Sequence, residues 1–394
     1  MTFSFFTKNS QDKNLALLVD VGSSSVGCAL ARLEKGRVPH VLFTTRESIS
    51  FQESLSSVKF LLAMNHALGR ALKTIQEKTG IIGAPNYFFC TLSSPWFILK
   101  SRHLSVVRQE PFKVTERSLE EFINEDIEHL KEELKETLPP KDVVIIEKKI
   151  IQIKLNGYDI KNPYDQMTAR LEIAMTVGVS SDRVIESIKR KLGQFLHSTA
   201  VHFGAFPIAA FSAVRDIFPT ENNFLFLDIT GEATDVSLVN GDILAGTVSF
   251  SRGKNFFIRE TSTQFRTLHE EAATLFAMYL RNELPSDKHA LVEGVVVRAE
   301  KEWLTRFEKV VATLANSGAL PRKVFFTTDA DIAVFFSRLI TAAKTEFLMS
   351  ESFEAQYLDQ LIVAKFVSFE HEVAWDSFLV VEALLAQKVI SSHN

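Results

Sequence analysis

The chain has 394 residues, of which 46% are hydrophobic and 23% are charged, a composition typical of a folded protein with two or three domains. Its net charge of −4 at pH 7 provides no positive field for nucleic acid, so we expect no such partner. Both cysteines, Cys28 and Cys90, lie in apolar segments, and no stretch reaches the roughly 18 consecutive apolar residues of a membrane-spanning helix. We therefore expect a cytoplasmic protein with reduced cysteines that reaches the inner face of a membrane only through partners.

The first predicted element is an apolar strand over residues 15–20, which ends in Asp20. A turn of small residues follows at 21–25. Two more strands and a helix come next, at 26–33, 38–44 and about 54–78.

From residue 86 the pattern changes to short strands around one charged helix. That helix is predicted from about 118 to 137, and Ser118 with Glu121 would form its capping box. The strands are expected at 87–93, 101–108, 142–155 and 169–177, before a helix at 181–195. Residues 86–178 therefore read as a small inserted α+β subdomain.

A second apolar strand that ends in an acid, 224–228, opens the next section. The turn after Asp228 leads to Asp235 and a strand, and Asn240-Gly241 predicts a hairpin. The remainder reads as mostly helical, with one more strand at 324–327. The acidic, partly amphipathic stretch 373–390 is expected to be a core or partner-binding helix rather than a membrane-binding one.

The two units in which an apolar strand ends in an aspartate and a turn, at 15–25 and 224–235, could bind a nucleotide between two lobes. Short turns of small residues expose backbone N–H groups to phosphates, and a carboxylate at each strand end can order Mg²⁺ through water. Asp20 and Asp228 are the predicted Mg²⁺ residues, and both could instead be ordinary turn acids. The full predicted nucleotide-binding set is Asp20, Gly22, Ser23, Ser24, Asp228, Gly231 and Thr234. No catalytic residue can be assigned.

These segments resemble a known superfamily. Residues 20–24 and 228–235 look like the two phosphate motifs of the actin and sugar-kinase superfamily, and 155–163 with 166–172 is similar to the closing segment of the inserted subdomain in the bacterial cell-division FtsA group. The pilus-assembly PilM group is a close second. The resemblance implies an actin-like (ribonuclease H-like) two-lobed α/β fold with an SHS2-like α+β insertion. The implied divisions are 1–85 and 179–220 for the first lobe, 86–178 for the insertion, 221–345 for the second lobe and 346–394 for a C-terminal helical segment.

The chain departs from the family pattern where phosphate would bind. Ser25 and Gly27 stand where FtsA and PilM proteins carry a lysine. The second loop keeps one glycine, Gly231, beside the acidic Glu232, which would repel phosphate. In place of the glycine-rich adenosine turn stands 327–330, and Asp329 and Asp331 are read as solvated loop acids rather than a metal pair. We therefore expect ATP and Mg²⁺ to bind weakly or not at all, and at most a weak ATPase.

Three functions remain open. The first is an FtsA-like scaffold of cell division or envelope assembly that binds partners, or copies of itself in protofilaments, through the inserted subdomain. The second is a PilM-like platform for a type IV pilus or secretion system. The third is a small-molecule kinase of the same fold, which would need a carboxylate base beside the acceptor hydroxyl.

Overall fold

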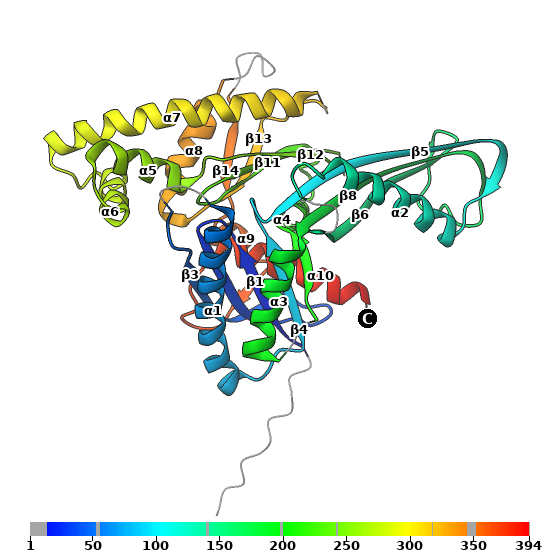
Figure 1. The fold of residues 1–394 in the computed structure, drawn as a ribbon, viewed down its shortest axis with the longest axis horizontal. Helices are drawn as coiled ribbons and strands as arrows, with labels where there is room; N and C mark the ends of the chain where they lie inside the picture. Colours follow the sequence, from blue (N-terminus) through cyan, green and yellow to red (C-terminus); the bar gives the residue numbers. More distant parts are fainter. Residues whose placement is uncertain are drawn as a thin grey trace, which may run out of the picture.

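The computed structural model describes residues 14–52, 56–138, 142–197, 200–241, 243–316, 318–344 and 352–393. The described strands form a six-stranded, a five-stranded and a four-stranded sheet. The first two sheets are the centres of two lobes, and the third belongs to a subdomain that projects to one side (Figure 1).

The first lobe is built on the sheet with strand order β15-β3-β2-β1-β4-β9. Its central strand β1 (Leu15–Val21) is fully buried and pairs antiparallel with β2 and parallel with β4. An unbroken apolar run is what a strand buried on both faces requires. The other strands are β2 (Ser25–Arg32), β3 (His40–Ser48), β4 (Tyr87–Leu92), β9 (His202–Ala205) and β15 (Ser368–Phe369). Helices α1 (Ser57–Ile82) and α3 (Asp182–Leu196) pack on each other over this sheet.

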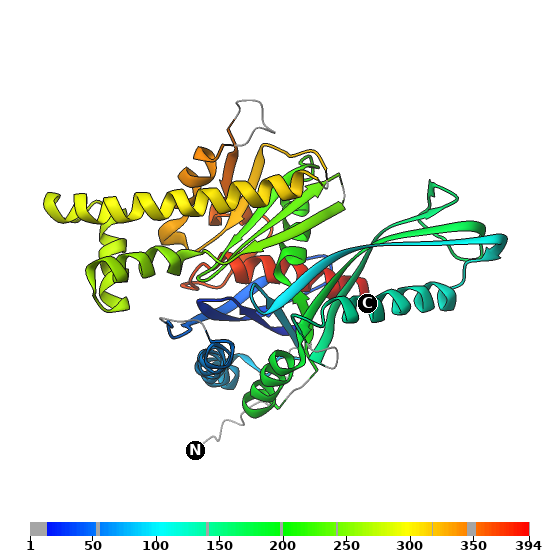
Figure 2. The same ribbon diagram turned by 45° about the horizontal axis from the view of Figure 1, so that its top comes forward.

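The second lobe repeats this order, β12-β11-β10-β13-β14, around an equally buried central strand β10 (Phe224–Ile229). The other strands are β11 (Thr234–Asn240), β12 (Ile243–Phe250), β13 (Lys323–Thr327) and β14 (Glu354–Tyr357). The helices are α5 (Lys254–Phe265), α6 (His269–Leu280), α7 (Ser286–Ala315) and α8 (Ala333–Ala342), with a 3₁₀ turn, η2, at Ala330–Ile332. The short helix α9 (Gln360–Val363) follows β14, and its Val363 packs in the core of the first lobe. The long helix α7 runs across the outer side of this lobe (Figure 2).

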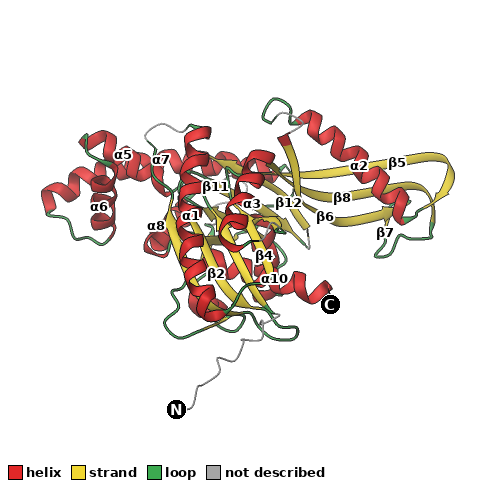
Figure 3. Ribbon diagram, turned by 60° about the horizontal axis from the view of Figure 1, so that its bottom comes forward, coloured by secondary structure: helices red, strands yellow, loops and turns green. Residues whose placement is uncertain are grey.

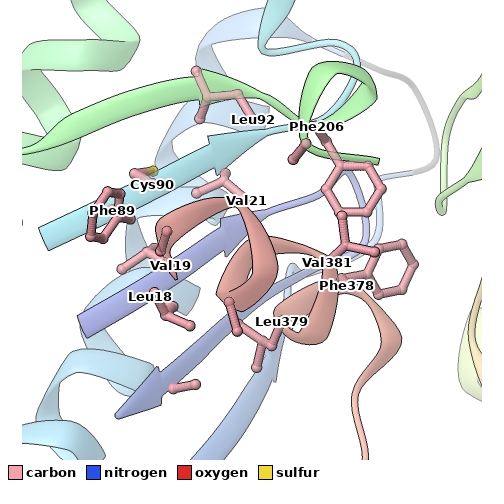
Figure 4. Packing of buried hydrophobic residues seen from close by; sticks show 14 of the residues in the cluster. Leu18, Val19, Val21, Phe89, Cys90, Leu92, Phe206, Phe378, Leu379 and Val381 are labelled. Carbon is pink, nitrogen blue, oxygen red and sulfur yellow. The ribbon is translucent and has the colours of Figure 1, made fainter. Parts of the chain in front are cut away.

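Two helices join the lobes into one core. Helix α10 (Ser377–His393) packs on β1, β2 and on α4 (Phe206–Ile217), which also contacts β10, β11 and β12. Figure 4 shows apolar side chains of α10, among them Leu379 and Val381, lying against β1 and β4. Phe206 of α4 links the lobes, since its ring lies 5.6 Å from that of Phe378 and 6.4 Å from that of Phe226 in β10. Within the described residues, no helix has the length and apolar character needed to cross a membrane.

The inserted subdomain has its own core. Its sheet, in the order β5-β8-β6-β7, carries helix α2 on one face (Figure 3). The elements are β5 (Phe97–Lys113), α2 (Glu116–Glu133), β6 (Val143–Leu155), β7 (Tyr158–Asp159) and β8 (Met167–Ser181). Arg102 fixes α2 to the sheet through paired hydrogen bonds to Asp126 (2.8 and 2.9 Å) and Glu133 (2.8 and 3.0 Å).

Several expected boundaries differ from the structure. Residues 87–92 form β4 of the first lobe, so the inserted sheet begins at Phe97 rather than at residue 86 and runs to Ser181 rather than to 178. The capping box of α2 pairs Thr115 with Ser118, one turn before the expected one. The segment 346–394 is not only helical, because β14 extends the second sheet and β15 pairs with β3 of the first. Short edge strands of two to four residues carry too little periodicity to be seen in sequence.

Candidate functional site

The two predicted phosphate loops follow equivalent strands. Asp20 lies opposite Gly27 of β2 and Thr91 of β4, and Asp228 lies opposite Asp235 of β11 and Thr327 of β13. Both carboxylates are buried at the carboxyl ends of their strands. In open α/β sheets, ligands bind outside these strand ends. The frame of a two-lobed nucleotide cleft is therefore present.

The two loops, however, touch each other. The hydroxyl oxygens of Ser23 and Thr230 lie 2.7 Å apart, and the backbone N–H of Glu232 donates to Ser23 Oγ at 2.8 Å. A Cβ on Gly231 would overlap the side chain of Ser24 and lie 3.1 Å from its Cα. The serines and the glycine expected to face phosphate therefore face the opposite loop.

A second contact between the lobes joins Asp235, at the end of the second predicted phosphate motif, to Ser94 and Ser249, which the sequence did not single out. Asp235 Oδ1 accepts hydrogen bonds from Ser94 Oγ (2.5 Å) and from Ser249 Oγ, and its Oδ2 accepts from the Ser94 N–H (3.2 Å). Ser94 follows β4 of the first lobe, whereas Asp235 and Ser249 belong to the second lobe. Thr234, expected to face phosphate, donates its hydroxyl to the backbone oxygen of Arg252 at 2.7 Å.

A third contact closes the cleft beside the second loop. The ring of Phe51 stacks on His269 with a centroid distance of 3.3 Å, and the Arg259 guanidinium lies 4.7 Å from the same ring. Arg259 also donates to the backbone oxygen of Gln52 (3.2 Å) and to both oxygens of Glu232 (3.1 Å). The negative charge of Glu232 is therefore paired with the guanidinium of Arg259.

The basic side chains described in the cleft are all bound to carboxylates. Arg259 holds Glu232, and Lys254 holds Asp329 at 3.0 Å and Asp331 at 3.1 Å. The two aspartates are therefore ion-paired, not merely solvated loop acids. Arg46 of β3 bridges Asp20 and Asp376. Arg46, Lys254 and Arg259 are therefore all paired with carboxylates, and none of these three is free to bind a triphosphate.

Burial has the largest influence on the pKa values of Asp20 and Asp228, the acids at the two strand ends. It raises the pKa of Asp20 to about 6, although Arg46 acts in the opposite direction. Burial, and then the neighbouring Asp235, raise the pKa of Asp228 well above its usual value, and Thr327 Oγ1 donates to Asp228 at 3.0 Å. No three His, Cys, Asp or Glu side chains among the described residues gather as a metal site. In this closed arrangement the residues do not fit a nucleotide with its Mg²⁺.

The adenosine side offers little room. A cavity of about 110 Å³ lies beside the turn Thr328–Ala330, between Arg46, Tyr357 and the start of α10. Pockets that take small-molecule ligands usually measure about 300–1,000 Å³. This cavity is too small for a nucleoside.

A larger cavity lies outside the predicted site. It measures about 810 Å³ and separates the base of the inserted subdomain from β12 of the second lobe. Residues 94–100 and 179–181 form one wall, and 247–251 form the other. The strands on its two sides, β5 and β12, are each the last strand of their sheet.

Comparison with known proteins identifies the fold. No protein-family model and no curated protein matches this chain in sequence. Among solved structures, a PilM–PilN type IV pilus biogenesis complex is similar over 95% of this chain and 98% of its own, with 13% identity and a TM-score of 0.62. The ethanolamine utilization protein EutJ from Carboxydothermus hydrogenoformans is similar over 94% and 89%, with 11% identity and a TM-score of 0.43. A Bacteroides thetaiotaomicron protein described as having an actin-like ATPase fold is similar over 94% and 96%, with 9% identity and a TM-score of 0.43. The chain has the actin-like ATPase fold that its sequence predicts.

Proposed function

We propose that this protein is an actin-fold scaffold that acts by binding other proteins rather than by turning over a nucleotide. The observation that carries the proposal is the closed cleft, in which the two phosphate loops hydrogen-bond to each other through Ser23 and Thr230. A nucleotide could enter only if these contacts and the Ser94–Asp235 contact were broken. The kinase alternative needs the same opening for its acceptor, so the geometry disfavours it as well.

The partner site that we propose is the cavity of about 810 Å³ at the base of the inserted subdomain. Terminal strands such as β5 and β12 have backbone groups that a further strand can pair with. An extended peptide can therefore dock by adding a strand and placing alternate side chains in the cavity. The occupant that we propose is an extended segment of a partner protein.

The apparatus that we propose is one assembled at the cell envelope, with this chain in the cytoplasm. Pilus biogenesis is favoured by the match over 95% of the chain to PilM in its complex with PilN. Cell division is the second candidate, because segments 155–163 and 166–172 resemble the FtsA group. Self-association into protofilaments through the inserted subdomain belongs to that second candidate.

Blocking the cavity tests the proposal. Ser251 is exposed and lines the cavity, so Ser251→Trp should fill it without disturbing the core. Ser105, exposed on β5 beyond the cavity, provides the matched Ser105→Trp control. Each variant is co-expressed with the proteins encoded beside its gene, and co-purification is measured. Ser251→Trp should lose a partner that Ser105→Trp retains, and loss or retention in both would place the partner site elsewhere.

A further inference from the structure

The guanidinium of Arg46 lies between strands β1, β2 and β3 of the first lobe and the start of helix α10. Its Nη2 donates to Asp20 Oδ2 at 2.8 Å and to Asp376 Oδ1 at 2.9 Å. Nε donates to Asp376 Oδ2 at 2.6 Å, and Nη1 donates to Ser25 Oγ at 2.9 Å. One side chain of β3 therefore links β1, β2 and the residue before α10.

The chain around Arg46 is shaped to admit it. Gly27 of β2 lies opposite Arg46 of β3, and a Cβ at that glycine would lie 2.5 Å from Nη2. The same guanidinium lies 5.0 Å from the centre of the Phe378 ring. Only glycine at position 27 leaves room for the guanidinium, so Gly27 is part of the binding site of the Arg46 side chain.

Asp20 needs a cation where it lies. Its side chain is 1% exposed, and its Oδ1 has no hydrogen-bond partner among the described residues. A buried carboxylate without a counter-charge is strongly destabilising. In a cleft that held a nucleotide, Mg²⁺ could supply that charge, but the closed loops leave no place for the nucleotide.

We propose that Arg46 is a resident counter-ion, which takes the place of a divalent cation between Asp20 and Asp376 and holds the first lobe to α10 without any ligand. The Nη2 nitrogen is the point at which one oxygen of each carboxylate converges. Divalent ions are commonly held by one or two carboxylates together with hydroxyl or water oxygens, and Ser25 supplies a hydroxyl nearby.

The bridge also acts on the start of α10. Asp376 Oδ1 accepts hydrogen bonds from the backbone N–H groups of Phe378 and Leu379, both at 3.1 Å, and so caps the helix. Helix α10 forms part of the core shared by the two lobes. The internal cation therefore fixes the helix on which the relation between the lobes depends.

Mn²⁺ alone is the probe that tests this proposal. In Arg46→Gln the guanidinium is lost while Asp20 and Asp376 remain, so the melting temperature should fall by more than about 5 °C. Added Mn²⁺ should bind once, detected by electron paramagnetic resonance, and should restore most of the loss. The natural protein should bind no Mn²⁺ at this place.

The double variant Asp20→Asn with Arg46→Gln provides the control. It keeps the space but lacks one ligand, so it should lose both the bound Mn²⁺ and the recovery of melting temperature. If Arg46→Gln does not fold by itself, refolding with Mn²⁺ should rescue it, and failure of that rescue overturns the proposal. A folded Arg46→Gln that binds no Mn²⁺, or a natural protein that binds Mn²⁺ through Asp20, overturns it as well.

Discussion

The cleft between the two lobes is closed by contacts within the chain, whereas the cavity at the base of the inserted subdomain is a space bordered by two terminal strands. In the cleft, Ser23, Glu232 and Arg46 bind groups of the same chain. At the cavity, two terminal strands border a space of about 810 Å³. Buried polar groups must be paired, either internally or by a ligand. The polar groups of the cleft are therefore satisfied without a ligand, which leaves the cavity as the space where we propose that a partner binds.

The largest expected effect comes from removing the inserted subdomain. Leu99 and Gly178 are paired across β5 and β8, so residues 100–177 can be replaced by a two-residue Asn-Gly turn. Because this subdomain has its own core, both lobes should stay folded, while association with the partner should be abolished. Circular dichroism and co-purification measure the two outcomes. The deletion keeps the cavity walls at 94–99, 179–181 and 247–251, so association that survives it would place the partner site outside the inserted sheet.

The fold was predictable because its main signals are local. Apolar strands ending in Asp20 and Asp228 are continuous in sequence, and the structure places both at equivalent strand ends. The closure of the cleft was not predictable, because it depends on pairs far apart in the chain. Arg46 and Asp376 are separated by 330 residues, and Ser23 and Thr230 by 207. Nothing in the local pattern of either segment identifies such a partner.

The second expected effect is a dependence of the free energy of unfolding on pH, caused by the carboxyl group of Asp20. Its pKa is raised from 3.8 to about 6 in the folded protein, so between these values the folded state keeps a proton that the unfolded state has lost. Stability should therefore fall as pH rises through this window, by about 3 kcal/mol in total. Denaturant unfolding of the natural protein and of Asp20→Asn between pH 4 and 7 measures it. Their difference should decline with pH, and a flat or rising difference would contradict the prediction.

A smaller effect is expected where the loops meet. Gly231→Ala would push its new Cβ against Ser24, which should cost about 1–3 kcal/mol of unfolding free energy. Adding Ser24→Gly removes the overlapping side chain and should restore much of the loss. The control is Gly80→Ala in α1, where an added Cβ would meet no described atom within 4 Å apart from its own stretch of helix, and where alanine should stabilise slightly. If Gly231→Ala is neutral, the loops are separated in solution.

The smallest expected effect is that of the nucleotide itself. Mg-ATP should bind no tighter than tens of micromolar, about −6 kcal/mol, because entry requires the contacts of Ser23 and Asp235 to break. A ligand that binds the folded state at 100 times its dissociation constant adds about 2.7 kcal/mol to stability. Millimolar Mg-ATP at that limiting affinity could add no more than this amount, and if the cleft stays closed and binds no nucleotide the melting temperature should change by less than about 1 °C. Asp228→Asn, which keeps the size of the side chain, should likewise leave association with the partner nearly unchanged. A rise of several degrees that Asp20→Ala removes, or loss of association in Asp228→Asn, would show that the cleft opens and that a nucleotide controls the scaffold.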